Sequence, residues 1–375
     1  MDLKRAGLYI HFPFCRAKCP YCHFTSVPIE GRLIERWQTG LANEAAQSAS
    51  EDYRVDTLYI GGGTPSLLGP DEMFRTRETL RANFRLDLAE FTLEANPDVR
   101  DEAFLQGWKD AGVSRLSVGV QSFDDRVLKI LGRGYTVRQA EEFLDLARKA
   151  GFGTISLDLM IGVPTEKRSS LRTTLGRVRE IGPDHVSLYI LENVEGLPFE
   201  SVVRDHPMDE DAAADAYELM RDGLEEAGLR RYEISNFARE GGECLHNLKY
   251  WHYESFLGLG PSACSHMGAM RWCNKPGLEA WASALAGGGG GDCREEVRPL
   301  PPEESVREAL IFGLRLVRGI SLGGFTERFG VDVMERFGRE VGDLVEEGLI
   351  LVEGDVLRIP DDKFLLSNQV FRRFV

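Results

Sequence analysis

Three cysteines near the start of the chain are the residues whose type and spacing most directly predict chemistry. Cys15, Cys19 and Cys22 follow the spacing C-x3-C-x2-C, immediately after a short apolar run at residues 8–12. Three thiolates can hold three irons of a [4Fe–4S] cubane, whereas clusters that only carry electrons are commonly closed by four cysteines. The spacing therefore predicts a [4Fe–4S] cluster whose fourth iron is open to a ligand.

A zinc site and three unliganded thiols are the alternatives. Structural zinc takes four ligands, and His23, beside Cys22, is available as the fourth. The chain has seven cysteines, and the four outside the cluster are scattered at Cys244, Cys264, Cys273 and Cys293. In a reducing cytosol this distribution indicates metal binding rather than a disulfide framework.

The elements that would position the cysteines follow a repeating pattern over the first 230 residues. Short β-branched or aromatic runs alternate with amphipathic helical patterns, which is typical of βα units around a parallel sheet. Six strands are expected, at residues 8–12, 55–60, 91–94, 115–120, 154–160 and 185–191. Six units are fewer than the eight of a closed barrel, so we predict an α/β fold, a partial (β/α)6 barrel.

Polar residues mark the carboxyl ends of these strands, which form the active-site face of such a barrel. The run Gly61-Gly62-Gly63-Thr64-Pro65-Ser66 follows the second strand, where bare backbone can approach a ligand and offer its amides. Glu94 ends the third strand, Gln121 follows the fourth, and Asp158 lies near the end of the fifth. Each alone could be a strand-end cap or a salt-bridge partner, but together they predict one binding site.

The stretch Y-I-H-F-P-F-C from Tyr9, followed by C-P-Y-C at residues 19–22, resembles the radical S-adenosylmethionine superfamily. Within it the chain is similar to the group of oxygen-independent coproporphyrinogen oxidase and the haem chaperone HemW, over nearly its whole length. The resemblance implies a cluster on the three cysteines, reductive cleavage of S-adenosylmethionine, and an electron donor. It assigns S-adenosylmethionine binding to Tyr9, Tyr21, Gly62, Gly63, Thr64, Glu94, Gln121, Arg133 and Asp158.

A second motif, H-N-L-K-Y-W at residues 246–251, resembles the H-N-x-x-Y-W motif of the HemW branch. A neutral imidazole is a good axial ligand for haem iron, so His246 is the candidate haem ligand. The alternative is a histidine and aromatic rings that only pack. The oxidases carry a further cysteine two residues beyond the triad, where this chain has Phe24, and they begin well before the cluster. Both differences favour the HemW branch.

Three positions depart from the HemW pattern. His23 stands where an acidic residue is usual, and Tyr135 stands where histidine often follows Leu-Gly-Arg. Ser262-Ala263-Cys264-Ser265 replaces Gly-Ala-His-Ser, so Cys264 and His266 are alternative residues at a haem edge.

Composition suggests four segments. We expect the barrel over residues 1–230, an aromatic, glycine-rich extension with the HNLKYW motif over 231–285, and a Gly/Pro-containing linker over 286–300. Residues 301–375 read as a small helical, winged-helix-like domain, because three helical patterns precede a hairpin around Gly354 and Asp355.

Charge and hydropathy exclude several classes of protein. The net charge is −15, and residues 301–375 hold 10 Lys or Arg against 14 Asp or Glu, which argues against a nucleic-acid partner. No run of 18 apolar residues and no signal-peptide pattern occurs. We therefore expect a cytoplasmic protein without a transmembrane segment.

Three functions remain open. A haem chaperone that binds haem and delivers it to target haemoproteins is preferred. Its partners would be haem or another porphyrin, an electron donor, and a haem-receiving protein such as a membrane respiratory enzyme. The alternatives are an oxygen-independent coproporphyrinogen III oxidase of porphyrin biosynthesis and a zinc-stabilised binding module.

Overall fold

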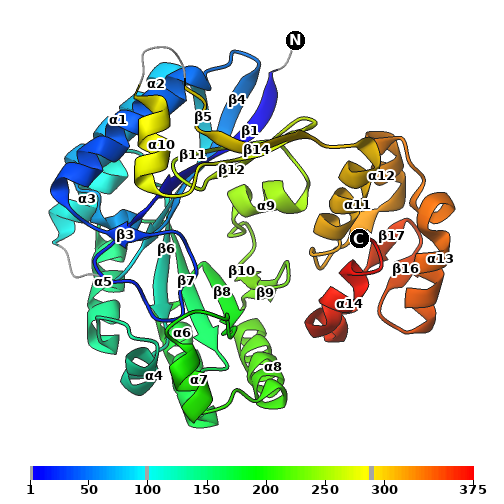
Figure 1. The fold of residues 1–375 in the computed structure, drawn as a ribbon. Helices are drawn as coiled ribbons and strands as arrows, with labels where there is room; N and C mark the ends of the chain where they lie inside the picture. The colour runs from blue at the N-terminus through cyan, green and yellow to red at the C-terminus, as the bar shows by residue number, and fades with distance from the viewer. Residues whose placement is uncertain (1–2, 98–100, 287–290) are drawn as a thin grey trace.

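A twelve-stranded sheet forms the body of the molecule (Figure 1), in a computed structural model that describes residues 3–97, 101–286 and 291–375. Its six central strands run parallel to one another. They are β1 (Lys4–Phe12), β4 (Tyr53–Gly62), β5 (Arg85–Ala95), β6 (Arg115–Gln121), β7 (Thr154–Ile161) and β8 (His185–Ile190). The sheet does not close on itself. The predicted partial barrel and its six strands are therefore confirmed.

Helices cover the outer face of the curved sheet (Figure 1). Their amphipathic faces bury large side chains such as Trp37, Trp108 and Phe143. The predicted capping box is present, since Thr136 N donates to Gln139 Oε1 at 2.9 Å. The barrel helices and turns are α1 (Gly31–Gln47), η1 (Pro65–Leu67), α2 (Pro70–Asn83), α3 (Glu102–Asp110), α4 (Asp125–Ile130), α5 (Val137–Lys149), α6 (Arg168–Ile181), α7 (Glu200–Asp205) and α8 (Glu210–Glu226).

Later parts of the chain extend both edges of the barrel sheet. At one edge β10 (Asn236–Ala238) pairs antiparallel with β8 and carries β9 (Arg230–Arg231). At the other edge β11 (Phe256–Leu259) pairs parallel with β1. Antiparallel strands then follow as β12 (Cys264–Met267), β13 (Met270–Asn274) and β14 (Arg294–Pro299). An edge strand offers unpaired backbone groups, so short segments with weak patterns of their own become strands there.

This edge differs from what the sequence indicated. An aromatic, glycine-rich extension was expected over residues 231–285 and a linker over 286–300, yet these two segments supply β11, β12, β13 and β14 to the sheet. Most of the glycine run, residues 287–290, lies outside the described residues.

A buried carboxylate on α1 fastens this extension to the barrel. Glu44 is 3% exposed and accepts hydrogen bonds from Gly260 N at 2.8 Å, Trp281 Nε1 at 2.9 Å and Asn274 Nδ2 at 2.5 Å. The Cys293 thiol lies 3.6 Å from it. Trp281 belongs to α10 (Leu278–Leu285), which packs along α1 (Figure 1). Four donors around one carboxylate offset the cost of burying its charge.

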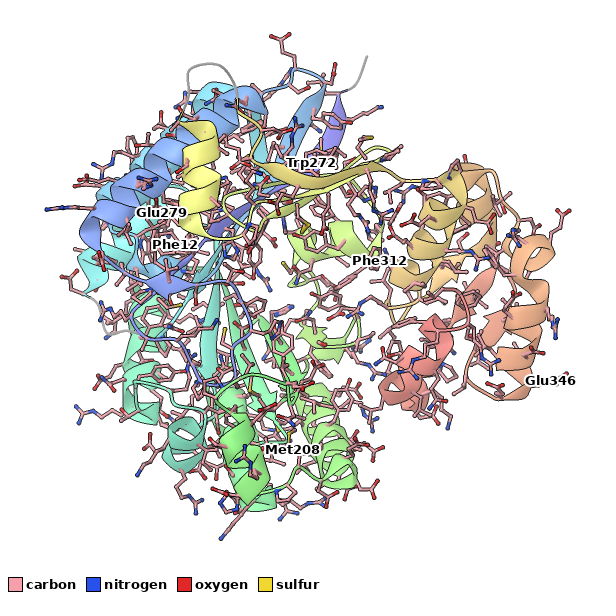
Figure 2. All side chains as sticks on the ribbon, in the orientation of Figure 1. Phe12, Met208, Trp272, Glu279, Phe312 and Glu346 are labelled. Atoms are coloured by element: carbon pink, nitrogen blue, oxygen red, sulfur yellow. A yellow bond between two sulfur atoms is a disulfide. The ribbon has the colours of Figure 1, made fainter. Side chains whose placement is uncertain are left out.

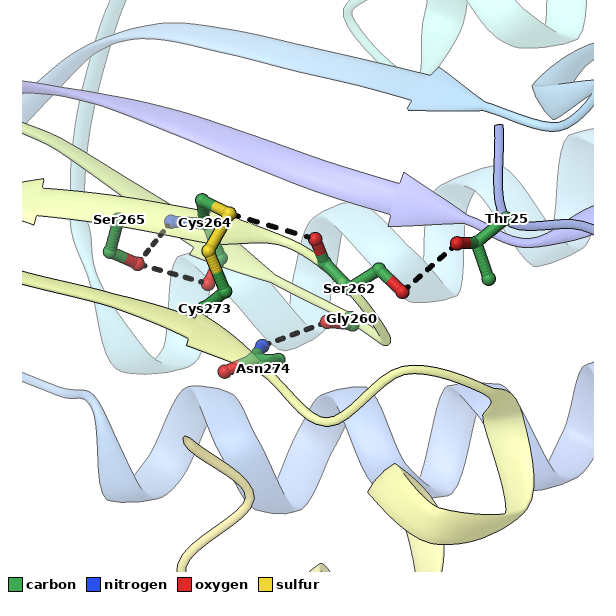
Figure 3. Close-up of a disulfide and its surroundings, with 8 residues drawn as sticks. Thr25, Gly260, Ser262, Cys264, Ser265, Cys273 and Asn274 are labelled. Atoms are coloured by element: carbon green, nitrogen blue, oxygen red, sulfur yellow. Dashed lines mark hydrogen bonds between the residues drawn. A yellow bond between two sulfur atoms is a disulfide. The ribbon is translucent and has the colours of Figure 1, made fainter. Parts of the chain in front are cut away.

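A disulfide joins Cys264 on β12 to Cys273 on β13 (Figure 3). The two residues face each other in the antiparallel register, which brings their sulfurs together. The expectation that the cysteines are not disulfide-bonded is therefore wrong for this pair. The pairing depends on strand register, which cysteine spacing does not report. Next to it, Ser262 Oγ donates to Thr25 Oγ1 at 3.2 Å and links the turn before β12 to the loop after β1.

The C-terminal part has a hydrophobic cluster of its own, which includes Leu310, Phe337, Leu344 and Phe374. Its helices are α11 (Pro302–Gly313), α12 (Leu322–Phe329), α13 (Val333–Glu346), η2 (Asp361–Leu366) and α14 (Ser367–Phe371). A small sheet orders β15 (Ile320–Ser321), β17 (Val356–Arg358) and β16 (Leu351–Glu353). The expected helices and hairpin are present. We propose a domain boundary near residue 300, which the separate cluster supports.

No helix within the described residues is both long and apolar enough to cross a membrane.

We predict that Glu44→Gln destabilises the protein by about 2 kcal/mol, because an amide nitrogen would then face buried donors. Urea unfolding measures the loss. Glu35→Gln is the matched control, since Glu35 is exposed on the same helix. Equal stability of the two variants would contradict the anchoring role of Glu44.

Candidate functional site

The loop after β1 carries the three cysteines to the carboxyl end of the sheet. Within it β2 (Phe14–Cys15) pairs with β3 (Val27–Pro28), and Cys22 N donates to Cys19 O at 3.1 Å. The three thiols are half-buried and line one cavity of about 460 Å³. The spacing therefore brings all three cysteines to one cavity.

The donor set of this loop fits an iron–sulfur cubane better than a single metal ion. Among the described residues, no three His, Cys, Asp or Glu side chains gather closely enough to hold one ion. Zinc needs all its donors within about 2.3 Å of one centre, whereas a cubane keeps its cysteines apart by its own width. His23, the expected fourth zinc ligand, is exposed, and its ring centroid lies 4.8 Å from that of Phe24.

Eight of the nine residues predicted to bind S-adenosylmethionine line the same cavity. They are Tyr21, Gly62, Gly63, Thr64, Glu94, Gln121, Arg133 and Asp158. The ninth, Tyr9, lies on β1, and its hydroxyl is 3.1 Å from His11 Nδ1 instead. The carboxyl ends of parallel strands meet at one edge, so residues distant in sequence converge there.

The glycine run holds the cysteine loop in place. Gly63 N donates to Phe12 O, and Thr64 N donates to Phe14 O, both at 2.7 Å. A Cβ on Gly63 would lie 2.5 Å from Phe14 O. Two of the amides that were expected to face a ligand are therefore bonded to the loop, and close backbone packing is the reason for glycine at residue 63.

Two half-buried carboxylates stand on the inner wall of the cavity. Glu94 accepts hydrogen bonds from Tyr59 OH at 2.9 Å and Gly62 N at 3.0 Å, and Asp158 accepts one from Ser117 Oγ at 2.9 Å. Burial, together with the charge of Asp158, raises the pKa of Glu94 to about 7. Burial likewise raises the pKa of Asp158. A bound cation would reverse both effects, so this wall suits the sulfonium and ammonium groups of S-adenosylmethionine.

Arg133 connects the cluster loop to the strand ends. Its guanidinium donates to Cys19 Sγ at 3.1 Å, Asn96 Oδ1 at 2.5 Å and Tyr135 OH at 2.8 Å. Tyr135 in turn donates to Gly119 O at 2.5 Å. Tyrosine at residue 135, the departure from the family pattern, therefore fixes the arginine.

Sequence reasoning missed Asn96, Ser117 and Tyr189, which also line the cavity. Asn96 follows Glu94 by two residues, and alternation along a strand puts such residues on one face, so this signal was available. Gln121 adopts φ 64°, a left-handed conformation that is uncommon outside glycine and concentrates at functional sites.

The HNLKYW motif forms α9 (Leu245–Trp251), which packs inside the barrel against β4 and β5. His246 is 1% exposed. Its Nδ1 lies 2.9 Å from Thr57 Oγ1, and its Nε2 lies 2.9 Å from Tyr250 OH. Burial lowers the pKa of His246 to about 3. Iron coordination would have to break one of these buried hydrogen bonds, so the geometry does not favour His246 as the haem ligand.

The alternative haem-edge residues are also engaged. Cys264 is in the disulfide, and the buried His266 has Nε2 at 3.0 Å from Gly268 O.

We predict about four irons per chain, with matching sulfide, after anaerobic reconstitution. Cys15→Ser should lose most of this iron, while Cys293→Ser keeps it, because Cys293 lies beside Glu44 away from the cavity. Metal and sulfide analysis measures both. One zinc per chain would establish the zinc alternative instead.

The chain is similar to known proteins along most of its length. A profile described as Radical SAM superfamily matches residues 9–178, and one described as HemN C-terminal domain matches residues 300–363. The haem chaperone HemW of Bacillus subtilis is 32% identical over 98% of this chain and 98% of its own. HemW of Escherichia coli is 38% identical over 70% of each chain.

Coproporphyrinogen III oxidase (HemN) of Escherichia coli shares the fold, with a TM-score of 0.86 and 22% identity over 99% of this chain and 90% of that one. Proteins of the radical S-adenosylmethionine superfamily hold a [4Fe–4S] cluster and S-adenosylmethionine, and the cavity at the end of the sheet suits both. The chain therefore belongs to the HemW family within the radical S-adenosylmethionine superfamily.

Proposed function

We propose that this chain is a haem chaperone that binds haem and passes it to target haemoproteins. The observation that carries the proposal is the match to HemW along 98% of both chains, which includes the C-terminal domain. Haem, and a protein that receives it, are the partners. A membrane respiratory enzyme is our candidate recipient, and the cytoplasm is our candidate location.

The residue at position 24 supports a chaperone over an oxidase. Phe24 lies on the rim of the cavity and is 56% exposed. By resemblance, the oxidases carry a cysteine there. A phenyl ring offers neither a metal ligand nor a hydrogen for transfer, so the site lacks one reactive group of the alternative enzyme.

We further propose that Cys15, Cys19 and Cys22 hold the cluster and that the cavity residues named above hold S-adenosylmethionine. When bound, the two together supply one-electron reduction of a sulfonium, with electrons from a donor protein. The chain's own part is to bind and orient. Glu94 and Asp158 attract the cationic groups, and Arg133 holds the cluster loop against the strand ends.

We predict that Glu94→Gln weakens S-adenosylmethionine binding by about tenfold or more, because a charge-assisted contact is lost. Titration of the cluster spectrum measures the affinity. Asp87→Asn is the control, since Asp87 lies on the same strand and is 67% exposed.

The same titration has a pH signature. The Glu94 carboxylate faces Asp158, Tyr59, Tyr9 and Tyr189. A cation binds the ionised form, and the pKa of Glu94 is raised to about 7, so the affinity should rise with pH through that value. Glu94→Gln should flatten the rise. An equally steep rise in the variant would show that another group is responsible.

We predict that the purified protein binds haem stoichiometrically and converts no coproporphyrinogen under reducing, anaerobic conditions. Absorption titration with haem and product analysis after adding S-adenosylmethionine give the two readouts. Formation of protoporphyrinogen would reverse the ranking and establish the oxidase alternative.

A further inference from the structure

The β12–β13 hairpin reaches the cysteine loop through the turn before β12. Figure 2 labels Trp272 on β13, and Figure 3 shows the turn beside Thr25. Ser262 Oγ donates to Thr25 Oγ1 at 3.2 Å, and the carbonyl of Thr25 accepts a hydrogen bond from His11 Nε2 at 3.0 Å. Thr25 lies between the cysteine triad and β3. The hairpin therefore holds the far end of the loop that carries the triad.

The disulfide closes the end of the hairpin from which this contact is made. Cys264 is the first residue of β12, and Cys273 lies near the end of β13. The crosslink is therefore at the end opposite the hairpin turn, close to Ser262. At the same end Ser262 N donates to Lys275 O at 3.1 Å. A covalent bond at this end limits how far Ser262 can move away from Thr25.

Ser262 adopts a backbone conformation that needs support. Its φ is 61°, in the left-handed region that glycine adopts readily and that a Cβ disfavours. The family pattern has glycine at this position and histidine at position 264, so the serine hydroxyl and the crosslinked sulfur are both departures made by this chain. Strained conformations persist only where surrounding contacts fix them. Opening the crosslink should therefore allow Ser262 to relax away from Thr25.

A thiol in solution can reach this disulfide. Cys264 is exposed and Cys273 is half-buried, whereas the other five cysteines are free thiols. After reduction, the antiparallel strand pairing keeps the two cysteines opposite each other. The pair can therefore open and re-form without rearrangement of the sheet.

We propose that Cys264 and Cys273 form a reversible thiol–disulfide switch whose oxidised form holds the cysteine loop in place through Ser262 and Thr25. The reductant is a dithiol. One of its thiolates attacks Cys264 Sγ, the sulfur–sulfur bond breaks, and Cys273 leaves as a thiolate that takes up a proton. The second thiol then attacks the mixed disulfide and releases Cys264, so two electrons and two protons pass from the dithiol to the pair. The consequence for a cluster rests on the proposed function of the triad, whereas the switch itself does not.

The test follows thiols and backbone amides in the full chain, prepared anaerobically. After treatment with oxidised glutathione, alkylation and peptide mass analysis should find Cys264 joined to Cys273. After dithiothreitol, both should be alkylated. Reduction should also speed hydrogen exchange about fivefold at Val27 N and Ile29 N, which bond to the opposite arm of the loop, because the support of one hydrogen bond is lost.

Ser262→Gly removes the hydroxyl and suits the left-handed backbone, so it should leave disulfide formation intact and make the exchange insensitive to reduction. Ser283→Gly is the matched control, because Ser283 is an exposed serine of the same extension, and it should respond as wild type does. The double variant Cys264→Ser, Cys273→Ser should show no response to dithiothreitol.

Three results would overturn the switch. They are free thiols at both positions after oxidised glutathione, equal exchange in the two redox states of wild type, and a wild-type response in either Ser262→Gly or the double variant. Failure of the chain to take up iron in both redox states would count against the cluster proposal alone.

Discussion

The carboxylate of Glu90 holds α9 inside the barrel, and much of the site depends on this contact. Glu90 points inward from β5 and accepts hydrogen bonds from Leu245 N and His246 N, both at 3.0 Å. These are backbone donors that the start of a helix leaves unsatisfied. Because Glu90 supplies their acceptor, the short helix α9 can begin in the interior of the open barrel without leaving these amides unsatisfied.

Helix α9 borders the barrel cavity on one side and the C-terminal domain on the other. Toward the barrel, Asn247 and Cys244 line a small polar cavity that also touches Glu94 and Asp158, so the motif helix borders the predicted S-adenosylmethionine site. Away from the barrel, the helix ends at Trp251 against α11. One short element therefore connects the two domains, and Tyr253, just beyond it, joins the hydrophobic cluster of the C-terminal domain.

The barrel interior is unusually polar for a βα fold. The layers of such barrels are normally filled by branched apolar side chains. Here Glu90 and His185 are buried, and Glu94 and Asp158 are half-buried. Tyrosine and serine hydroxyl groups are partners of Glu94, Asp158 and His185, whereas Glu90 accepts from backbone N–H groups. Burying charge costs free energy unless it is compensated. Hydrogen bonds inside the barrel supply part of this compensation, and a cationic ligand beside Glu94 and Asp158 would supply more.

The sequence by itself determined the residues at the ends of the parallel strands. Cys15, Glu94 and Asp158 were predicted to share one site because parallel strands end at a common edge, a rule that needs no three-dimensional detail. Local signals also sufficed for the capping box at Thr136 and the hairpin at Gly354. Each depends on residues only a few positions apart.

Only the tertiary structure decided the features that depend on contacts between distant segments. His246 meets Thr57 across 189 residues, and that contact encloses the imidazole expected to bind iron. The pairing of Cys264 with Cys273 needed the strand register, and the approach of Arg315 to Trp251 needed two domains in contact. Spacing along a chain does not specify such neighbours, because they are set by which surfaces pack together after the local elements have formed.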